Sequence, residues 1–136
     1  MPHNFDDVGD FHEKFDLYNT THHPTGPRIL PEELMGFRIK FLREEFDEFI
    51  EGYEERNEAK MADALVDLVY VAMGTAHLKG YPWRALWAEV QRANMTKERA
   101  LSSDDSRSKR GSSYDVVKPD GWQPPDIEGV LRRHGW

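Results

Sequence analysis

Two segments decide the fold of this chain: REEFDEFIEG at residues 43–52 and ADALVDLVYVAMGTA at residues 62–76. The first places its apolar residues at the spacing of one helical face, and no proline interrupts it. The second is apolar on most sides, which is typical of a central, buried helix. It nevertheless carries Asp63 and Asp67 four residues apart. Four residues make about one helical turn, so we expect both carboxylates on the same face of this helix.

Helical periodicity continues on both sides of these segments. We expect helices at about residues 4–18, 31–55, 58–79 and 82–95, with Asn4 as the N-cap of the first helix. Prolines 31 and 82 fit the first position of a helix, and Gly80 is placed to end one. The pattern predicts one all-α, four-helix-bundle-like domain over residues 1–136. The apolar side chains expected to face inward are Leu42, Phe46, Phe49 and Tyr53 on the second helix, and Trp83, Leu86 or Trp87, and Val90 on the fourth.

The composition changes after Leu101. Residues 102–113, SSDDSRSKRGSS, are nearly free of apolar side chains. They predict a loop, and we expect the region 102–118 to be flexible without a ligand. Residues 114–118 read as a short extended segment, PDGWQPP as a rigid turn, and Asp126 as the cap of a last short helix.

Charge is spread unevenly over the 136 residues, whose net charge is −7. Residues 1–90 carry 9 Lys/Arg against 18 Asp/Glu, and residues 91–136 carry 9 against 7. An acidic body argues against a nucleic-acid surface, but it suits a site where carboxylates collect cations and a later segment supplies positive charge to phosphates. No apolar run approaches the roughly 18 residues of a membrane helix, and no signal peptide is visible. The absence of cysteine excludes thiolate metal sites and fits a reducing cytosol, so we expect a cytoplasmic protein.

Carboxylates gather on the second predicted helix. Glu44, Glu48 and Glu51 fall on one side of it, opposite the apolar stripe, and Glu45 lies between the two faces within reach of Glu48. Acidic helix faces are common at protein surfaces. Taken alone, these glutamates therefore favour a solvated face over a functional site.

The aspartates of the next helix favour a functional site over a solvated face. An ionised carboxylate in a buried helix is costly unless it is paired, and the nearest cation is Lys60. A divalent cation shared with the glutamates would satisfy all of these groups, and hard oxygen ligands favour Mg²⁺ or Mn²⁺. No Glu-x-x-His occurs, which argues against a di-iron bundle.

Four segments in order carry a resemblance to a known family: the two quoted above, then VQRANMTK at residues 90–97 and VVKPDGWQPPDI at residues 116–127. The set resembles the MazG-like all-α NTP pyrophosphohydrolases, in the branch related to phosphoribosyl-ATP pyrophosphohydrolase. That branch includes many phage enzymes, among them the MazZ type. The resemblance implies a homodimer or homotetramer in which the helix bundle is completed between subunits.

The resemblance also implies a metal centre. Glu45 and Glu48 match metal-binding glutamates, and Asp67 matches the metal-binding aspartate of the later helix. Glu44 matches a water-activating base or an extra metal ligand, so the catalytic set is Glu44, Glu45 and Glu48. Asp63 resembles the first aspartate of phage members and binds metal directly or through water. Two or three Mg²⁺ or Mn²⁺ ions per site are implied.

Five further residues are implied to face the substrate. Asn94, Lys97 and Lys118 match positions near the phosphates or sugar in relatives. Arg38 matches a family arginine that fixes a carboxylate or the dimer interface, and a surface ion pair is the alternative. His12, together with its aromatic neighbours, is placed near the nucleobase, whereas a packed or surface histidine is the plainer interpretation.

The activity implied is hydrolysis of a (deoxy)nucleoside triphosphate between its α and β phosphates, with dGTP or GTP favoured. Alternatives are a house-cleaning enzyme for dUTP or many dNTPs, phosphoribosyl-ATP hydrolysis, and a helical module that binds nucleotides without hydrolysis. No P-loop motif is present, so a motor-type NTPase lacks its signature. Neither nucleic acid nor membrane is an expected partner.

Overall fold

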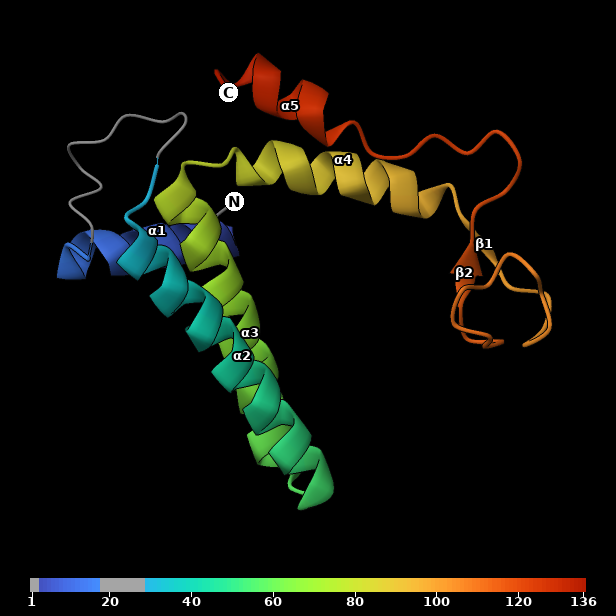
Figure 1. Cartoon of the computed structure of the whole chain (residues 1–136), viewed down its shortest axis with the longest axis horizontal. Helices are drawn as coiled ribbons and strands as arrows, with labels where there is room; N and C mark the ends of the chain where they lie inside the picture. The colour runs from blue at the N-terminus through green and yellow to red at the C-terminus, as the bar shows by residue number, and fades with distance from the viewer. Residues whose placement is uncertain (1–2, 18–28) are drawn as a thin grey trace. The chain divides into compact units, whose positions relative to one another are not determined.

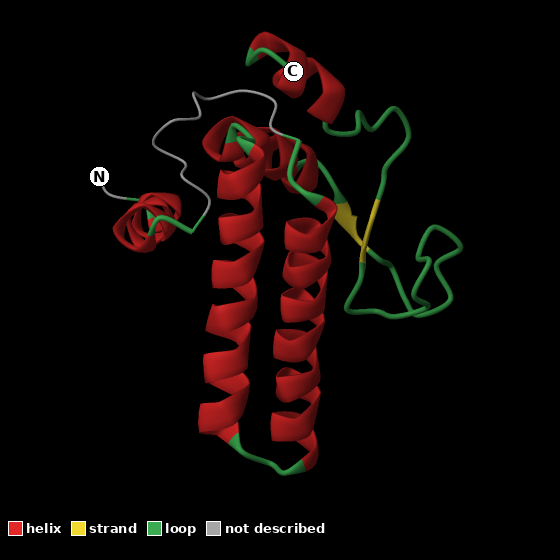
Figure 2. Cartoon of the chain, turned by 60° about the vertical axis from the view of Figure 1, so that its left-hand side comes forward, coloured by secondary structure: helices red, strands yellow, loops and turns green. Residues whose placement is uncertain are grey.

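The computed structural model describes residues 3–17 and 29–136, and the regular secondary structure of this part is helical apart from one two-residue antiparallel ladder (Figures 1 and 2). This confirms the all-α fold class. The chain divides into two compact units, one of Met1–Trp83 with Gly135–Trp136 and the other of Arg84–His134.

The first unit contains α1 (Asn4–Phe15), α2 (Glu32–Glu54) and α3 (Glu58–Lys79). α2 and α3 run antiparallel, side by side, as the two long helices of Figure 2. A three-residue turn joins them, and the side chain of Asn57 caps α3 by accepting a hydrogen bond from the Lys60 amide at 3.0 Å. Gly80 ends α3 with a φ of 74°, as predicted, because the left-handed conformation suits glycine.

The predicted starts of three helices need correction. His3, not Asn4, caps α1: its Nδ1 accepts from the Phe5 amide at 3.1 Å, and the Asp6 carboxylate accepts from the His3 amide at 3.0 Å. An imidazole nitrogen can therefore complete a capping box in place of the usual hydroxyl or amide. Pro31 occupies the N-cap of α2 and not its first helical position, and α4 begins one residue after Pro82.

α2 packs on α3 through a face that the apolar pattern of its sequence does not predict. Its buried residues are Arg38, Glu45 and Gly52, spaced seven apart and hence about two turns. At Gly52 an added Cβ would lie 3.0 Å from the Met61 amide nitrogen, so the helices approach closely there. The prediction of an inward stripe was wrong for the single chain, in which Phe46 is 52% and Tyr53 68% exposed.

α3 is also less covered than predicted. Ala64, Val71 and Met73 are buried, but Leu65, Val66 and Val69 are exposed. By length and composition α3 is also apolar enough to cross a membrane, a test that core helices pass as well. The first unit therefore has an apolar face on α3 and an aromatic face on α2 that its own described residues do not cover.

The second unit takes up most of α4 (Trp83–Met95), then β1 (Glu98–Arg99), β2 (Val116–Val117) and α5 (Ile127–Arg133). β1 and β2 pair antiparallel, Glu98 opposite Val117. The Trp122 indole N–H donates to the Ala93 carbonyl near the end of α4 at 2.8 Å, which fastens the proline-rich turn to that helix. Asp126 caps α5 as predicted, whereas Trp87 is exposed and does not face inward.

The loop between β1 and β2 is organised by charge and not by apolar burial. The Asp105 carboxylate accepts from the Leu101 amide and the Arg107 guanidinium, each at 3.0 Å. The buried Asp115 accepts from the Ser108 hydroxyl and from Arg110, each at 2.8 Å. The predicted flexibility of this region stays a prediction, but these hydrogen bonds give the loop a defined path without a core.

We expect Asp115→Asn to loosen this loop at neutral pH. The Ser108 hydroxyl, the Val116 amide and Arg110 lower the pKa of Asp115. A lowered pKa stabilises the fold above the ordinary value of 3.8, and this contribution is lost as the pH falls below it. Hydrogen exchange of residues 101–118 should therefore be faster in the variant at pH 7, and the difference should fade in acid. The exposed Asp104→Asn is the control, and equal protection of variant and wild type at pH 7 would contradict this role.

Candidate functional site

The α2–α3 hairpin brings the predicted acids of both helices together. Gly52 lies against Lys60 and Met61. Because the helices are antiparallel, seven residues back along α2 and seven forward along α3 bring Glu45 opposite Asp67. The charges of Glu48, Asp67 and Asp63 all act on Glu45, which places these four carboxylates within one electrostatic neighbourhood.

Glu45 is the centre of this acid cluster. Its side chain is buried, with the residue 8% exposed, and its Oε2 atom has no hydrogen-bond partner in the part of the chain that the structure describes. Burial raises its pKa, and the neighbouring Glu48 and Asp67 raise it further. Burial also raises the pKa of Asp67, to which Asp63 adds its charge and a hydrogen bond. The cluster is thus under mutual repulsion.

The nearest lysine does not relieve this repulsion. The Lys60 Nζ lies 3.2 Å from Glu51 and 3.3 Å from Glu55, at the turn end of the hairpin. Glu51 is therefore held in an ion pair, apart from the predicted metal ligands. This leaves the inner carboxylates without a compensating cation from Lys60.

The four carboxylates of the acid cluster are suitable ligands for a hard divalent cation. All four groups are carboxylates, and the orphaned Oε2 of Glu45 is a buried acceptor that a cation would satisfy. Glu48 and Asp63 are exposed and Asp67 half-buried, so the cluster opens to the surface. No three His, Asp or Glu side chains within residues 3–17 and 29–136 are grouped closely enough to hold a metal ion as they stand. The ligand roles of Glu44, Glu45, Glu48, Asp63 and Asp67 therefore stay predictions.

His12 and Arg38 lie inside the first unit. His12 is 2% exposed, and its Nδ1 is 2.8 Å from the Val8 carbonyl. Arg38 is 6% exposed and donates to the Val71 carbonyl at 2.8 Å and to the Thr75 hydroxyl at 3.1 Å. A surface ion pair is therefore wrong for Arg38, and contact of either side chain with substrate would require it to be uncovered.

Gly74 makes room for this buried pair. A Cβ at this position would lie 2.6 Å from Nη2 of Arg38 and 2.8 Å from Cε1 of His12. The burial of Arg38 lowers its pKa, and burial together with the nearby Arg38 charge lowers that of His12. The glycine within an otherwise apolar helix was the sequence signal that a bulky polar group packs against α3.

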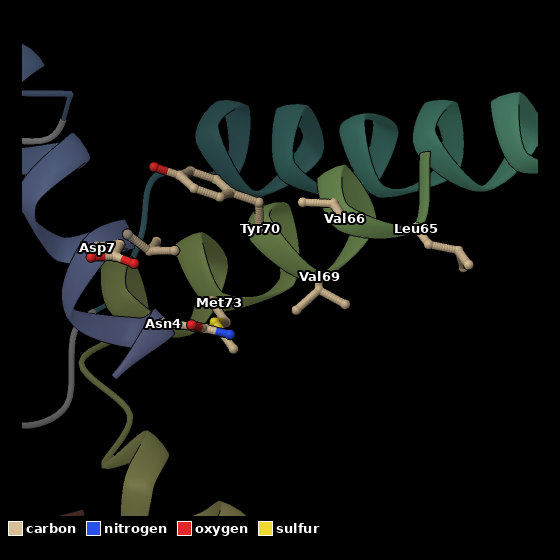
Figure 3. A pocket seen from close by; sticks show the side chains of 8 residues that line it. Asn4, Asp7, Leu65, Val66, Val69, Tyr70 and Met73 are labelled. Carbon is tan, nitrogen blue, oxygen red and sulfur yellow. The ribbon is translucent and has the colours of Figure 1, made fainter. Parts of the chain in front are cut away.

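A groove between α1 and α3 was not foreseen from the sequence (Figure 3). It has a volume of 540 Å³, within the usual range for small-molecule sites. The exposed apolar face of α3 forms most of it, and α1 adds two polar side chains. Its lining residues are Asn4, Asp7, Val8, Leu65, Val66, Val69, Tyr70 and Met73.

The second unit carries a basic pocket of 200 Å³. The ammonium groups of Lys97 and Lys118 lie 5.4 and 5.0 Å from the centre of the Trp122 ring, so the structure brings these two predicted residues together. Asn94 is exposed near the end of α4. The cations that line the pocket are Lys97, Arg107, Lys109, Arg110 and Lys118.

A helical hairpin that gathers four carboxylates, one of them with a buried oxygen that has no hydrogen-bond partner among the described residues, has the features of an all-α hydrolase of phosphorylated substrates. Comparison with known families identifies it further: the family model of phosphoribosyl-ATP pyrophosphohydrolase matches residues 8–94, well over half of the chain. The chain therefore belongs to this family, within the MazG-like all-α branch that the sequence resembles. No curated protein matches the chain.

Family membership defines the reaction type. The chain is a pyrophosphohydrolase that acts on nucleotide phosphoanhydrides, and enzymes of this family typically need a divalent metal. The matched residues contain α2, α3 and all of the predicted metal ligands. Lys97, Lys118 and the loop cations lie beyond them.

We expect Glu45→Gln and Asp67→Asn to abolish turnover and to raise the melting temperature of the metal-free protein. The raised pKa values mean that ionisation of these groups opposes folding as the pH rises through them, and a neutral amide removes that penalty at pH 7. Thermal unfolding in chelator and in Mg²⁺ measures this. Mg²⁺ should stabilise the wild type and the control Glu54→Gln but not the two variants. Lower melting temperatures for both variants in chelator would argue against the repulsion.

Proposed function

We propose that the chain hydrolyses a (deoxy)nucleoside triphosphate between its α and β phosphates, releasing a monophosphate and pyrophosphate, with dGTP or GTP as the favoured substrate. The orphaned, buried Oε2 of Glu45 within a cluster of four carboxylates carries this proposal. Membership of a pyrophosphohydrolase family supports cleavage of the phosphoanhydride bond between the α and β phosphates.

The chain's own carboxylates have two roles in this proposal. Glu45, Glu48, Asp63 and Asp67 hold two or three Mg²⁺ or Mn²⁺ ions, and repulsion among them favours cation binding. When bound, such cations polarise phosphate oxygens and lower the pKa of an attacking water. Glu44 is exposed one turn before Glu48, and its carboxylate accepts the proton of that water.

Lys97 and Lys118, to which this proposal assigns the phosphates, lie at the basic pocket of the second unit. In its pocket, Arg107 is paired with Asp105 at 3.0 Å and Arg110 with Asp115 at 2.8 Å. Lys97 and Lys118 instead rest on Trp122 and form no ion pair with a carboxylate of the described residues, so their charge is available to an anion. Asn94, at the end of α4, adds an amide that donates to a phosphate or to the sugar.

The uncovered apolar surfaces support self-association. The aromatic face of α2 exposes Phe37, Phe46 and Tyr53. Large apolar patches of this kind mark interaction surfaces in soluble proteins. We therefore include a homodimer or homotetramer in the proposal, with the helix bundle completed between copies.

Phosphoribosyl-ATP is a second candidate substrate, and the family match favours it. Its hydrolysis breaks the same kind of bond, so the acid cluster serves both reactions equally. A house-cleaning enzyme would accept dUTP or many dNTPs at similar rates, and a nucleotide-binding module would release no product.

A substrate panel separates these possibilities. We expect turnover with Mg²⁺ or Mn²⁺ and none in excess chelator, because hard oxygen ligands form the site. The panel contains all NTPs, all dNTPs and phosphoribosyl-ATP, with products separated by anion-exchange chromatography. dGTP or GTP should give dGMP or GMP with pyrophosphate in one step.

Other results of the same panel would contradict parts of the proposal. Diphosphate and orthophosphate would show cleavage at the γ phosphate, and full activity in chelator would exclude a metal mechanism. Equal rates for all dNTPs would support house-cleaning. Exclusive use of phosphoribosyl-ATP would replace the favoured substrate.

We expect Lys118→Ala to raise the KM for the triphosphate while kcat and stability change less. The lost charge acts on phosphates, and the Trp122 ring retains its hydrogen bond to Ala93. Steady-state kinetics over a range of salt concentrations gives the measurement, since screening should shrink the difference. Arg132→Ala removes a cation of α5 that pairs with Glu128 and serves as the control. A KM equal to that of the wild type would remove Lys118 from the substrate site.

A further inference from the structure

The groove between α1 and α3 has two chemically different ends (Figure 3). Val66 and Val69 form an apolar wall along α3, and Met73 continues it beneath α1. At the α1 end, the groove is lined by three polar groups: the Asp7 carboxylate, the Asn4 amide and the Tyr70 hydroxyl. An apolar slot with a few polar groups at one end is the usual form of a site for a flat, heteroaromatic ligand.

Tyr70 fixes the shape of this end. Its ring meets Phe11 edge-on, with ring centres 5.5 Å apart and an interplanar angle of 88°. Burial raises the pKa of Tyr70, and the charges of Asp7 and Asp10 raise it further. The Tyr70 phenol therefore stays protonated and can donate a hydrogen bond, and its surroundings are negatively charged.

The groove and the acid cluster lie on the same helix. Tyr70 follows Asp67 by three residues and Asp63 by seven, which corresponds to rises of roughly 4.5 and 10.5 Å along α3. The Leu65 end of the groove lies away from α1 (Figure 3), and along the chain Leu65 stands between Asp63 and Asp67. A nucleotide with its base beside α1 would therefore extend its phosphates toward the cations held by the cluster.

Electrostatics selects this direction over the reverse one. Asp7 and Asp10 repel a triphosphate at the α1 end, whereas a neutral base that offers N–H donors is attracted there. At the other end, the carboxylates accept the phosphates only through bound cations. The charges at the two ends of the groove thus favour one orientation of a bound nucleotide, with its base beside α1.

We propose that this groove binds the nucleobase and that Asp7 and Asn4 read the edge of guanine. This inference rests on the proposed function. A carboxylate has only acceptors, and guanine presents two adjacent donors to it, N1–H and the 2-amino group. The Asn4 amide donates to O6 on the same edge.

The other bases match this pair less well. Adenine and cytosine each place a ring nitrogen acceptor beside their amino group, which meets the Asp7 carboxylate with like partial charge. Uracil and thymine flank their single N–H with two carbonyl oxygens. A site built around paired hydrogen bonds rejects ligands that lack them, because its own polar groups are left unpaired.

Asp7→Asn tests the inference, with Asp10→Asn as a control of equal charge on the same helix and outside the groove. We measure kcat/KM for dGTP, dATP and dITP, which lacks the 2-amino group. The wild type should favour dGTP over the other two by roughly 10- to 100-fold, the usual discrimination of one bidentate contact. Asp7→Asn should lose most of this preference by slowing dGTP, whereas Asp10→Asn should keep it. Asn4→Ala should lower kcat/KM for dGTP and dITP, which share O6, more than for dATP.

Binding measured without turnover separates this inference from the proposed function. Calorimetry in chelator with dGMP and dAMP should show tighter binding of dGMP to the wild type and a loss of that preference in Asp7→Asn. Turnover with an unchanged base preference in Asp7→Asn would overturn the role of Asp7 while the proposed function stands. Absence of turnover with every nucleotide would overturn the proposed function, and the calorimetric preference would still decide the groove. A changed oligomeric state in Asp7→Asn without a changed base preference would show that a second copy covers the groove, against the inference.

Discussion

The burial of the Glu45 carboxylate, whose Oε2 atom has no hydrogen-bond partner among the described residues, is the constraint on which the rest of this structure depends. Glu45 lies between α2 and α3, and the neighbouring acids of both helices raise its pKa. A core that served stability alone would place an apolar side chain here, since a buried charge is costly unless it is compensated. The hairpin therefore keeps a strained polar centre in its metal-free state. A divalent cation bound at this centre would offset the repulsion, and its binding free energy would add to the stability of the hairpin.

This constraint also explains which side of α2 faces solvent. The helix can turn only one face toward α3, and the acid cluster requires that face to contain Glu45, with Gly52 two turns later at the close approach. The aromatic residues Phe46 and Tyr53 must then lie on the outside of the single chain. Their exposure follows from the demands of the site, and a second copy of the chain is the simplest structure that would cover them.

Much of the fold could be predicted from the sequence because its signals are local. The end of α3 follows from Gly80 and the start of α5 from Asp126, and the carboxylates of Glu45 and Asp67 are marked by helical spacing within apolar segments. The face of α2 that packs on α3 could not be predicted from periodicity. The larger apolar stripe lies on another face of the helix, and the contacts with α3 determine which face is buried. The burial of His12 and the groove beside Asp7 depend on how α1 lies on α3. Periodicity carries no information about contacts between residues so far apart in the chain.

In the site that we propose, selectivity among nucleotides comes from α1 and the groove. The carboxylates of α2 and α3 would act on phosphates through cations, and Lys97 and Lys118 through charge, so these groups would meet features that every nucleoside triphosphate shares. Interactions that bind all substrates equally cannot distinguish them. α1 holds none of the four carboxylates of the acid cluster, yet it places Asp7 and Asn4 at one end of an apolar slot along α3, the helix that carries Asp63 and Asp67. A change in base preference among relatives of this chain would therefore arise through substitutions on α1 that leave the hairpin and its acids intact.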